Sequence, residues 1–268
     1  MANPVLSRPD AFTPAQPSYG YGGYAQAYAA QPGVGYGQAP AQPAPATMRL
    51  DDVLNKTAIM LSLLVVSAGA AWTFIPDALL YPAALVCGLV SIIFPFLVIT
   101  RQHAAPGLIA VYSLVQGVFI GGISKIFEAY YPGIVVQAVL GTFATAGVVL
   151  VAFRFGGYRA TERGNRIVRT ALMAFLGVAL LNLVLRLFGL NLGLFPAPGE
   201  SVSLLAWIGA LVGVGLATYS LLQDFTYIEH GVAIGARSEQ SWIAAYGLIV
   251  TLVFLYTQIL RVLSYIRR

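Results

Sequence analysis

The sequence predicts an all-α, polytopic membrane protein: a bundle of seven transmembrane helices that follows a disordered N-terminal tail. Three observations support this fold class. Only 9% of the 268 residues are charged and 58% are hydrophobic, whereas about 25% of residues are charged in soluble domains. Long runs without Asp, Glu, Lys or Arg recur along the chain after about residue 47. Each run could supply the roughly 20 residues that a helix needs to cross a ~30 Å hydrocarbon core.

Residues 1–47 differ in composition from the rest of the chain. Their middle reads SYGYGGYAQAYAAQPGVGYGQAPAQPAPA, which has neither a helical nor a strand period. Such a segment cannot bury enough apolar surface to offset the entropy lost on ordering. We therefore expect a disordered cytoplasmic tail over residues 1–47 and a transmembrane domain over residues 48–268. The tail is a solvated tether in this interpretation, and its tyrosines could also contact a protein partner.

The apolar runs define the seven predicted spans. The alternation typical of a barrel strand is absent, and helices are the other structure that satisfies the backbone within lipid. We place the spans at residues 56–75, 79–99, 107–127, 134–153, 170–190, 204–227 and 242–263. Two pairs of glycines, Gly117 with Gly121 and Gly209 with Gly213, have the spacing that favours close helix packing in membranes.

The arrangement of Lys and Arg predicts the orientation. The segments on the tail's side hold ten of these residues and the opposite segments hold five. The loop FRFGGYRATERGNRIVR contributes most to this difference, and the positive-inside rule then places the tail in the cytoplasm. Three arginines near the C-terminus oppose the rule. Either the other loops outweigh them, or the last apolar segment re-enters the membrane and leaves on the inner side.

The remaining composition narrows the class of protein. The net charge is +5, but the arginines lie mainly between apolar runs, so orientation in the lipid bilayer explains them better than a nucleic-acid partner. The single cysteine, Cys87, offers neither an internal disulfide nor a cysteine metal cluster. Abundant Ala, Gly, Pro and Arg with few Lys suggest a bacterium with a GC-rich genome, which favours a bacterial plasma membrane; the alternative is a eukaryotic internal membrane.

The most informative single residue is Asp224, in the stretch LLQDFTYIEHG, which ends the charge-free run 201–223. An acid at mid-membrane costs on the order of 3 kcal/mol, and such residues are functional by default. Loss of water favours the neutral carboxyl, so we expect Asp224 to change charge near physiological pH. A carboxylate is also a ligand for hard cations, which makes Asp224 the candidate metal ligand. The alternative is a solvated charge at the helix end, which nearby Glu229 and His230 favour.

Helical spacing places Asp224 on a small and polar face. Gly213, Ala217, Ser220 and Asp224 follow one another at steps of four, three and four residues, so they share one side of the sixth span. In the last span a similar stripe contains Gly247, Thr251 and Gln258. We expect both stripes to face the bundle interior.

Three stretches carry a family resemblance: GGISKIFEAYYPGIVVQAVLGTFATAGV, ATYSLLQDFTYIEHG and LIVTLVFLYTQILRVL. They resemble the Bax inhibitor family, also called the transmembrane Bax-inhibitor-motif family, and the similarity covers about residues 50–266. The resemblance implies a seven-helix bundle with a central last helix. It also implies a pH-controlled leak of calcium or another cation, with calcium as the transported ion and no cofactor.

The resemblance further implies candidate site residues. In that family two aspartates on the last two helices form a pH sensor; Asp224 matches the first, and Gln258 stands where the second is expected. Gln258 cannot share a proton, but it could donate a hydrogen bond to Asp224 or offer its carbonyl oxygen to a cation. Arg101 lies near the position of a basic latch for the first aspartate. Glu128 and Gln137 could line an outer pore mouth, or be solvated interfacial residues.

Enzymatic functions fit the sequence poorly. A metalloprotease needs a histidine cluster, but the two histidines, His103 and His230, lie on different segments. A serine hydrolase needs a base beside its nucleophile, but Ser124 has no histidine on a facing span. An aspartyl intramembrane protease needs two acids within the membrane, and the sequence offers one, Asp224. We therefore expect no enzymatic activity. The rival to a leak channel is a non-conducting membrane scaffold, or a stress or cell-death regulator that recruits partners through its tail.

Overall fold

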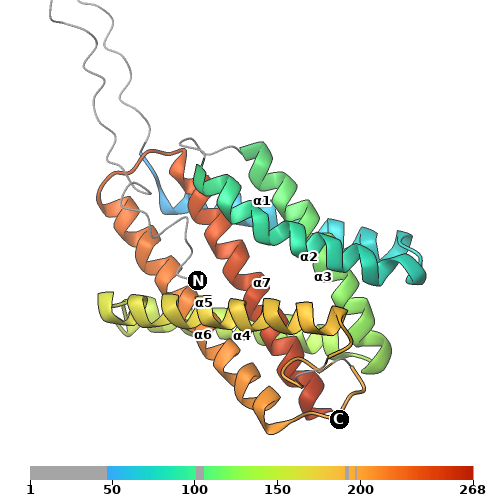
Figure 1. Ribbon diagram of the computed structural model, residues 1–268. Coiled ribbons are helices and arrows are strands. Elements are labelled where there is room, and N and C mark those ends of the chain that lie inside the picture. Colours follow the sequence, from blue (N-terminus) through green and yellow to red (C-terminus); the bar gives the residue numbers. More distant parts are fainter. Residues whose placement is uncertain (1–46, 101–105, 191–192, 197, 268) are drawn as a thin grey trace, which may run out of the picture.

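A computed structural model describes residues 47–100, 106–190, 193–196 and 198–267. Within these ranges the chain forms seven helices and no strand (Figure 1). The helices are α1 (Leu50–Phe74), α2 (Asp77–Thr100), α3 (Pro106–Tyr130), α4 (Ile134–Phe155), α5 (Glu162–Leu187), α6 (Leu204–Ala233) and α7 (Gln240–Ile266). All seven are long and apolar enough to cross a membrane, which confirms the predicted fold class. Residues 1–46 of the predicted tail lie outside the described residues.

Several helices extend beyond the predicted apolar spans because polar residues begin them. Helix α1 begins at Leu50 instead of residue 56, and its first turn holds Asp51 and Asp52, whose charges favour a helix N-terminus. Helix α5 begins at Glu162 instead of residue 170, because the side chain of Thr161 accepts a hydrogen bond from the Gly164 amide at 3.1 Å. Such caps satisfy backbone donors that hydropathy does not register.

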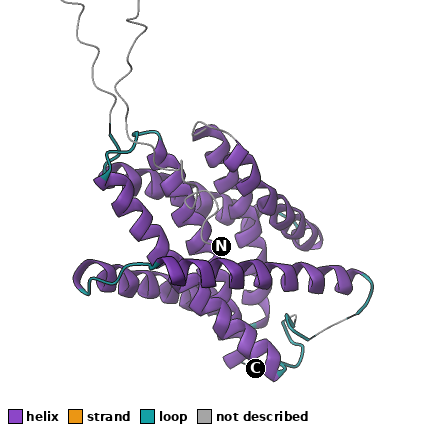
Figure 2. Ribbon diagram, turned by 60° about the vertical axis from the view of Figure 1, so that its left-hand side comes forward, coloured by secondary structure: helices purple, strands orange, loops and turns teal. Residues whose placement is uncertain are grey.

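The last helix is the centre of the bundle. Helix α7 packs against α1, α3, α4 and α6, and most of its residues are buried. The peripheral helices are attached more simply, since α2 packs on α3 and α5 packs on α6. Figures 1 and 2 show α5 running across α6 and α7 instead of alongside them. The central position of α7 agrees with what the family resemblance implies.

Glycines bring α1 and α3 into close contact. A Cβ atom added to Gly117 would collide with the carbonyl oxygen of Leu64, and one added to Gly121 would collide with that of Ala68. Small residues therefore let the two backbones approach, as the glycine spacing predicts.

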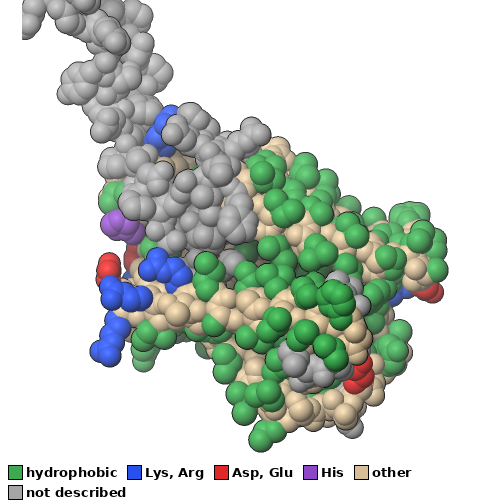
Figure 3. All heavy atoms as spheres, in the orientation of Figure 1, with side chains coloured by type: hydrophobic (Ala, Val, Ile, Leu, Met, Phe, Trp, Pro, Cys, Tyr) green, Lys and Arg blue, Asp and Glu red, His purple; other side chains and the backbone are tan. Residues whose placement is uncertain are grey.

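The surface of the bundle is apolar over most of the face drawn in Figure 3. Large side chains such as Val66, Val136 and Val148 are more than 60% exposed. A soluble monomer does not carry apolar surface of this extent, but acyl chains cover it in a bilayer. The protein is thus an integral membrane protein.

The two ends of α7 lie at opposite ends of the bundle. Near its start, Thr47 forms an isolated β-bridge with Arg237, and the Met48 amide donates to the Ala236 carbonyl at 2.7 Å. The helix then continues without interruption to Ile266. The structure therefore has a full seventh crossing, and not the re-entrant last segment considered from the charge distribution.

Candidate functional site

Asp224 lies inside the protein and well within α6. It is 1% exposed, and α6 continues for nine residues after it to Ala233. Glu229 and His230 follow on the exposed part of the same helix. Asp224 is therefore not a solvated charge at a helix end.

The small and polar face predicted on α6 is the buried face of this helix. Gly213, Ala217 and Ser220 are buried together with Asp224, whereas Leu211 on the opposite side is 58% exposed. Helical periodicity alone therefore identifies which way Asp224 points. The corresponding stripe on α7, with Gly247, Thr251 and Gln258, is buried as well.

The carboxyl group of Asp224 has few partners. The Thr251 side chain on α7 lies close enough to interact with it, but among the described residues neither carboxyl oxygen accepts a hydrogen bond of ordinary geometry. A hydrogen bond weakens steeply outside that geometry. A buried polar group without a partner loses about 1–3 kcal/mol, and a charged one loses more. Such a group is retained where its reactivity or its charge is used.

A polar network joins the neighbours of Asp224 to α5. The Gln223 side-chain amide donates to Asn165 Oδ1 at 2.7 Å, and Asn165 Nδ2 donates to the Tyr227 hydroxyl at 3.3 Å. Gln223 is fully buried. No local sequence pattern predicts this network, although the glutamine next to the buried aspartate indicates that a second polar group lies at the same depth.

The two candidate sensor residues are not brought together. Gln258 packs over Gly213, where an added Cβ atom would collide with the Gln258 side-chain oxygen. Gly213 precedes Asp224 by eleven residues, which is about 16 Å along the helix. The Gln258 oxygen has no hydrogen-bond partner among the described residues. Gln258 therefore does not donate a hydrogen bond to Asp224 in this structure, contrary to one of the roles considered from the sequence.

The other candidate residues have separate environments. Arg101 lies outside the described residues, so the structure gives no geometry for the latch. The Glu128 carboxylate accepts hydrogen bonds from the amides of Gly133 and Val135 at 2.5 and 3.0 Å, so it caps the start of α4. Gln137 is exposed on α4. These contacts explain Glu128 as the cap of α4.

Polar contacts also hold the α6–α7 loop at the end of the bundle where Met48 lies. Lys56 on α1 donates to the Ser238 carbonyl at 3.2 Å and to the Ser241 hydroxyl. The Lys56 ammonium also lies 5.1 Å from the centre of the Trp242 ring. This clamp was not found from the sequence, because it depends on contacts between residues more than 180 positions apart.

The groups weighed as catalytic do not form a recognisable catalytic arrangement among the described residues. The Ser124 hydroxyl is within 2.7 Å of the Tyr256 hydroxyl, and neither is a base that would activate a nucleophile. No group of three or more His, Cys, Asp or Glu side chains within the described ranges could hold a metal ion together.

A family model described as Bax inhibitor 1 like matches residues 3–268, which is nearly the whole chain. No curated protein matches the sequence.

Proposed function

Because the chain belongs to the Bax inhibitor 1 like family, we propose that it is a pH-sensitive leak channel or transporter for calcium or another cation, and not an enzyme. The observation that carries this proposal is the carboxyl of Asp224. It is buried at the α6–α7 contact, and both of its oxygens lack hydrogen-bond partners among the described residues. Residues of this kind within membrane proteins are associated with ion pathways and proton relays.

The protonation state of Asp224 determines whether the α6–α7 contact attracts a cation. The neutral carboxyl is far cheaper to bury than the carboxylate. The ionised form attracts a cation, and no guanidinium or ammonium among the described residues pairs with it. Among the described residues, the Thr251 hydroxyl on α7 interacts with it directly, and the Tyr227 phenol on α6 is coupled to it electrostatically. Tyr227 is in turn influenced by Arg169 and Glu162 on α5. Flux should therefore depend on pH through essentially one carboxyl.

The proposed cation passes through the site and does not stay in it. Calcium in a stable site takes six to eight oxygen ligands. Asp224 and Thr251 together supply only three side-chain oxygens, so a cation there keeps much of its water. Conduction requires binding that is weak enough for the ion to leave. One carboxylate with one hydroxyl suits that requirement.

Gln258 is proposed as a second and independent polar step. Its free carbonyl oxygen lies in the same α6–α7 contact but about 16 Å from Asp224 along α6. An amide has no titrating proton, so Gln258 could contact a passing cation without responding to pH. The proposal also includes a latch at Arg101 and an outer pore mouth at Glu128 or Gln137. Substitution of each residue tests its role.

The proposed location is a bacterial plasma membrane with the N-terminus in the cytoplasm. The charge bias of the loops supports this orientation. Tyr158, in the loop before α5, is 65% exposed and suits labelling. In a Cys87→Ser background, a Tyr158→Cys variant should react with a membrane-impermeant thiol reagent only after the cells are opened. Labelling in intact cells would show the opposite orientation, with the N-terminus outside the cytoplasm.

The experiment that tests the function is calcium entry into dye-loaded liposomes that contain the purified protein. Flux clearly above that of protein-free liposomes supports the leak function. Liposomes that contain correctly folded protein and show no flux, for calcium or for monovalent cations, would favour the non-conducting scaffold that recruits partners through its tail.

A further inference from the structure

Residues 47–49, called the strap below, precede α1 and are bound to the loop that joins α6 and α7 (Figure 1). Thr47 forms an isolated antiparallel β-bridge with Arg237, and the Met48 amide donates to the Ala236 carbonyl at 2.7 Å. Gly235 turns the loop directly before this pairing, with a φ of 66° that lies in the left-handed region and favours glycine. The strap is thus fastened by backbone contacts and is not part of a helix.

The Met48 side chain enters the bundle from the strap. It is 2% exposed and lies in one apolar cluster with Val149 of α4, Ile228 of α6 and Leu248 of α7. The other buried members of this cluster belong to helices, except Ala236 in the α6–α7 loop. Met48 is therefore the one large buried side chain of the cluster that can leave without unwinding a helix.

This cluster covers Asp224 on the side of the α6–α7 loop. Ile228 follows Asp224 by four residues, and Leu248 precedes Thr251 by three. At these spacings each apolar residue shares a helix face with its polar neighbour. Both lie about one turn nearer to the α6–α7 loop than Asp224 and Thr251 do. The space between the Asp224 site and this end of the bundle is therefore filled by apolar side chains, Met48 among them.

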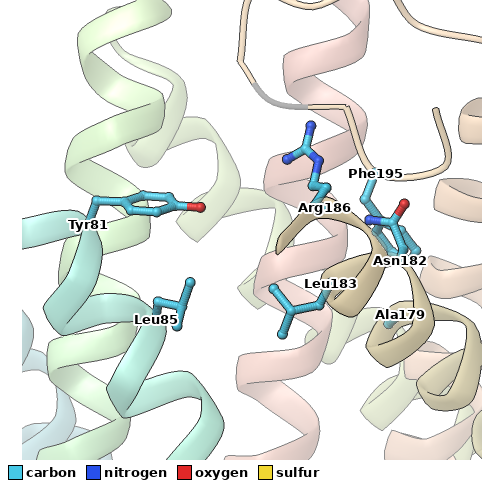
Figure 4. Close-up of a pocket in the computed structure, with 7 residues that line it drawn as sticks. All are labelled: Tyr81, Leu85, Ala179, Asn182, Leu183, Arg186 and Phe195. Carbon is cyan, nitrogen blue, oxygen red and sulfur yellow. The ribbon is translucent and has the colours of Figure 1, made fainter. Parts of the chain in front are cut away.

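The cavity drawn in Figure 4 does not provide another way to Asp224. Its volume is about 340 Å³, and it lies between α2 and α5, where Tyr81 and Leu85 lie opposite Leu183 and Arg186. None of the described residues that line it belongs to α6 or α7. Asp224 itself is 1% exposed. Water or a cation that comes from the loop end of the bundle therefore reaches Asp224 only if the cluster around Met48 opens.

We propose that the strap is a lid over the Asp224 site, and that the Met48 side chain is the part that closes it. The lid is closed in this structure. When the pairing with Ala236 and Arg237 breaks, Met48 leaves the cluster, and water enters between α6 and α7 from this end. Such an opening breaks few contacts, so it requires far less free energy than unfolding of the bundle. The consequence for cation flux rests on the proposed leak function, whereas the access of water to Asp224 does not.

Thiol labelling of the purified full-length protein in detergent tests the access of water. In a Cys87→Ser background, Asp224→Cys places a thiol at the site, and its reaction rate with a water-soluble thiol reagent reports access. Addition of Met48→Ala should raise this rate about tenfold or more. A tenfold rise corresponds to an opening free energy lower by about 1.4 kcal/mol, which is within what burial of a methionine side chain contributes.

The matched control for labelling is Met60→Ala. Met60 also lies on the α1 side of the bundle and is 0% exposed, but it belongs to a different apolar cluster with Phe94 and Tyr112. This control removes the same side chain and should leave the labelling rate unchanged. An equal rise in both variants would overturn the proposal, because it would reflect general loosening of the bundle. An unchanged rate in Met48→Ala would overturn it as well.

A reversible cross-link tests the lid without removing Met48, and so also serves where Met48→Ala fails to fold. Thr47→Cys with Arg237→Cys, again with Cys87→Ser, pairs two exposed positions of the β-bridge. Antiparallel partners have Cα atoms about 4.5–5.5 Å apart, which is within the range that a disulfide spans. Oxidation should lower calcium flux into liposomes about tenfold or more, and reduction should restore it. The control, Thr47→Ser with Arg237→Ser, should not respond to either reagent.

Flux that is unchanged by complete cross-linking would overturn the lid. An absence of flux in the reduced protein as well as in the parent would instead contradict the proposed leak function. In that case the labelling rates of the Met48→Ala and Met60→Ala variants still decide whether the strap closes the Asp224 site.

Discussion

The two halves of the contact between α6 and α7 bury polar groups in different ways. In the half next to the α6–α7 loop, Asp224 faces Thr251 and is bordered by the Gln223–Asn165 network. In the other half, Gln258 packs over Gly213 and Arg261 lies beside Gly209. One half therefore contains a buried acid, and the other contains a neutral amide and a largely buried guanidinium.

This difference shows why the patterns of two separate helices do not establish that two residues, one from each helix, lie in contact. Both Asp224 and Gln258 lie on buried stripes, as the periodicity predicts. Because α6 and α7 are antiparallel, however, the contact between Gly213 and Gln258 places the residue opposite Asp224 near Gly247, one turn from Thr251. Glycine at position 213 creates the space for Gln258. The register of the two helices thus separates the two side chains.

The largest expected effect concerns the anchoring of the Asp224 half. Met48 is 2% exposed and belongs to an apolar cluster with Leu221 and Ile228 of α6. Met48→Ala should lower the free energy of unfolding by about 2–5 kcal/mol, because it leaves a cavity in this cluster. Denaturant or thermal unfolding in detergent measures the change.

The control for this prediction is deletion of residues 2–46, which keeps Met48. The composition of the deleted segment offers little apolar surface that could pack on the bundle. Membrane insertion and thermal stability should therefore stay near those of the parent. A deletion as destabilising as Met48→Ala would show that the tail docks on the bundle.

A smaller effect is expected in the Gln258 half. A valine at position 213 would collide with the Gln258 side chain, and such overpacking costs about 1–3 kcal/mol. Gly215, two residues later, has open space around it, so Gly215→Val is the matched control with the same change of residue. Equal stability of Gly213→Val and Gly215→Val in detergent would contradict the packing described for Gln258.

The smallest effect is expected at the exposed ion pair that joins the loop before α5 to α6. Arg159 Nε donates to Glu229 at 2.6 Å, but both side chains are more than a third exposed. Glu229→Gln should therefore lower the free energy of unfolding by no more than about 1 kcal/mol. The difference from the parent should shrink further at 1 M salt, where charges are screened within ~3 Å. A larger loss that is unaffected by salt would point to a structural role for this carboxylate.

The sequence predicts the membrane crossings well because a span must be a long run without charge. It also predicts which side of α6 is buried, since small and polar residues recur with the helical period up to Asp224. It does not predict the neighbours of Asp224 across helices. The Asn165–Gln223 hydrogen bond and the Lys56 clamp join segments far apart in the chain, and no local pattern determines such contacts. The central α7 was expected only from the family resemblance.

The most direct test of the proposed mechanism is the pH profile of calcium flux for Asp224→Asn in liposomes, measured from about pH 5 to about pH 8. Asparagine keeps the shape of the side chain and removes its titrating proton, so the variant should fold as the parent does and lose most of the pH dependence. Gln258→Asp, measured alongside, should add a separate titration step, because carboxyls about 16 Å apart along the helix are too far from each other to share one proton. If Asp224→Asn leaves both the flux and its pH profile as in the parent protein, Asp224 does not control cation passage.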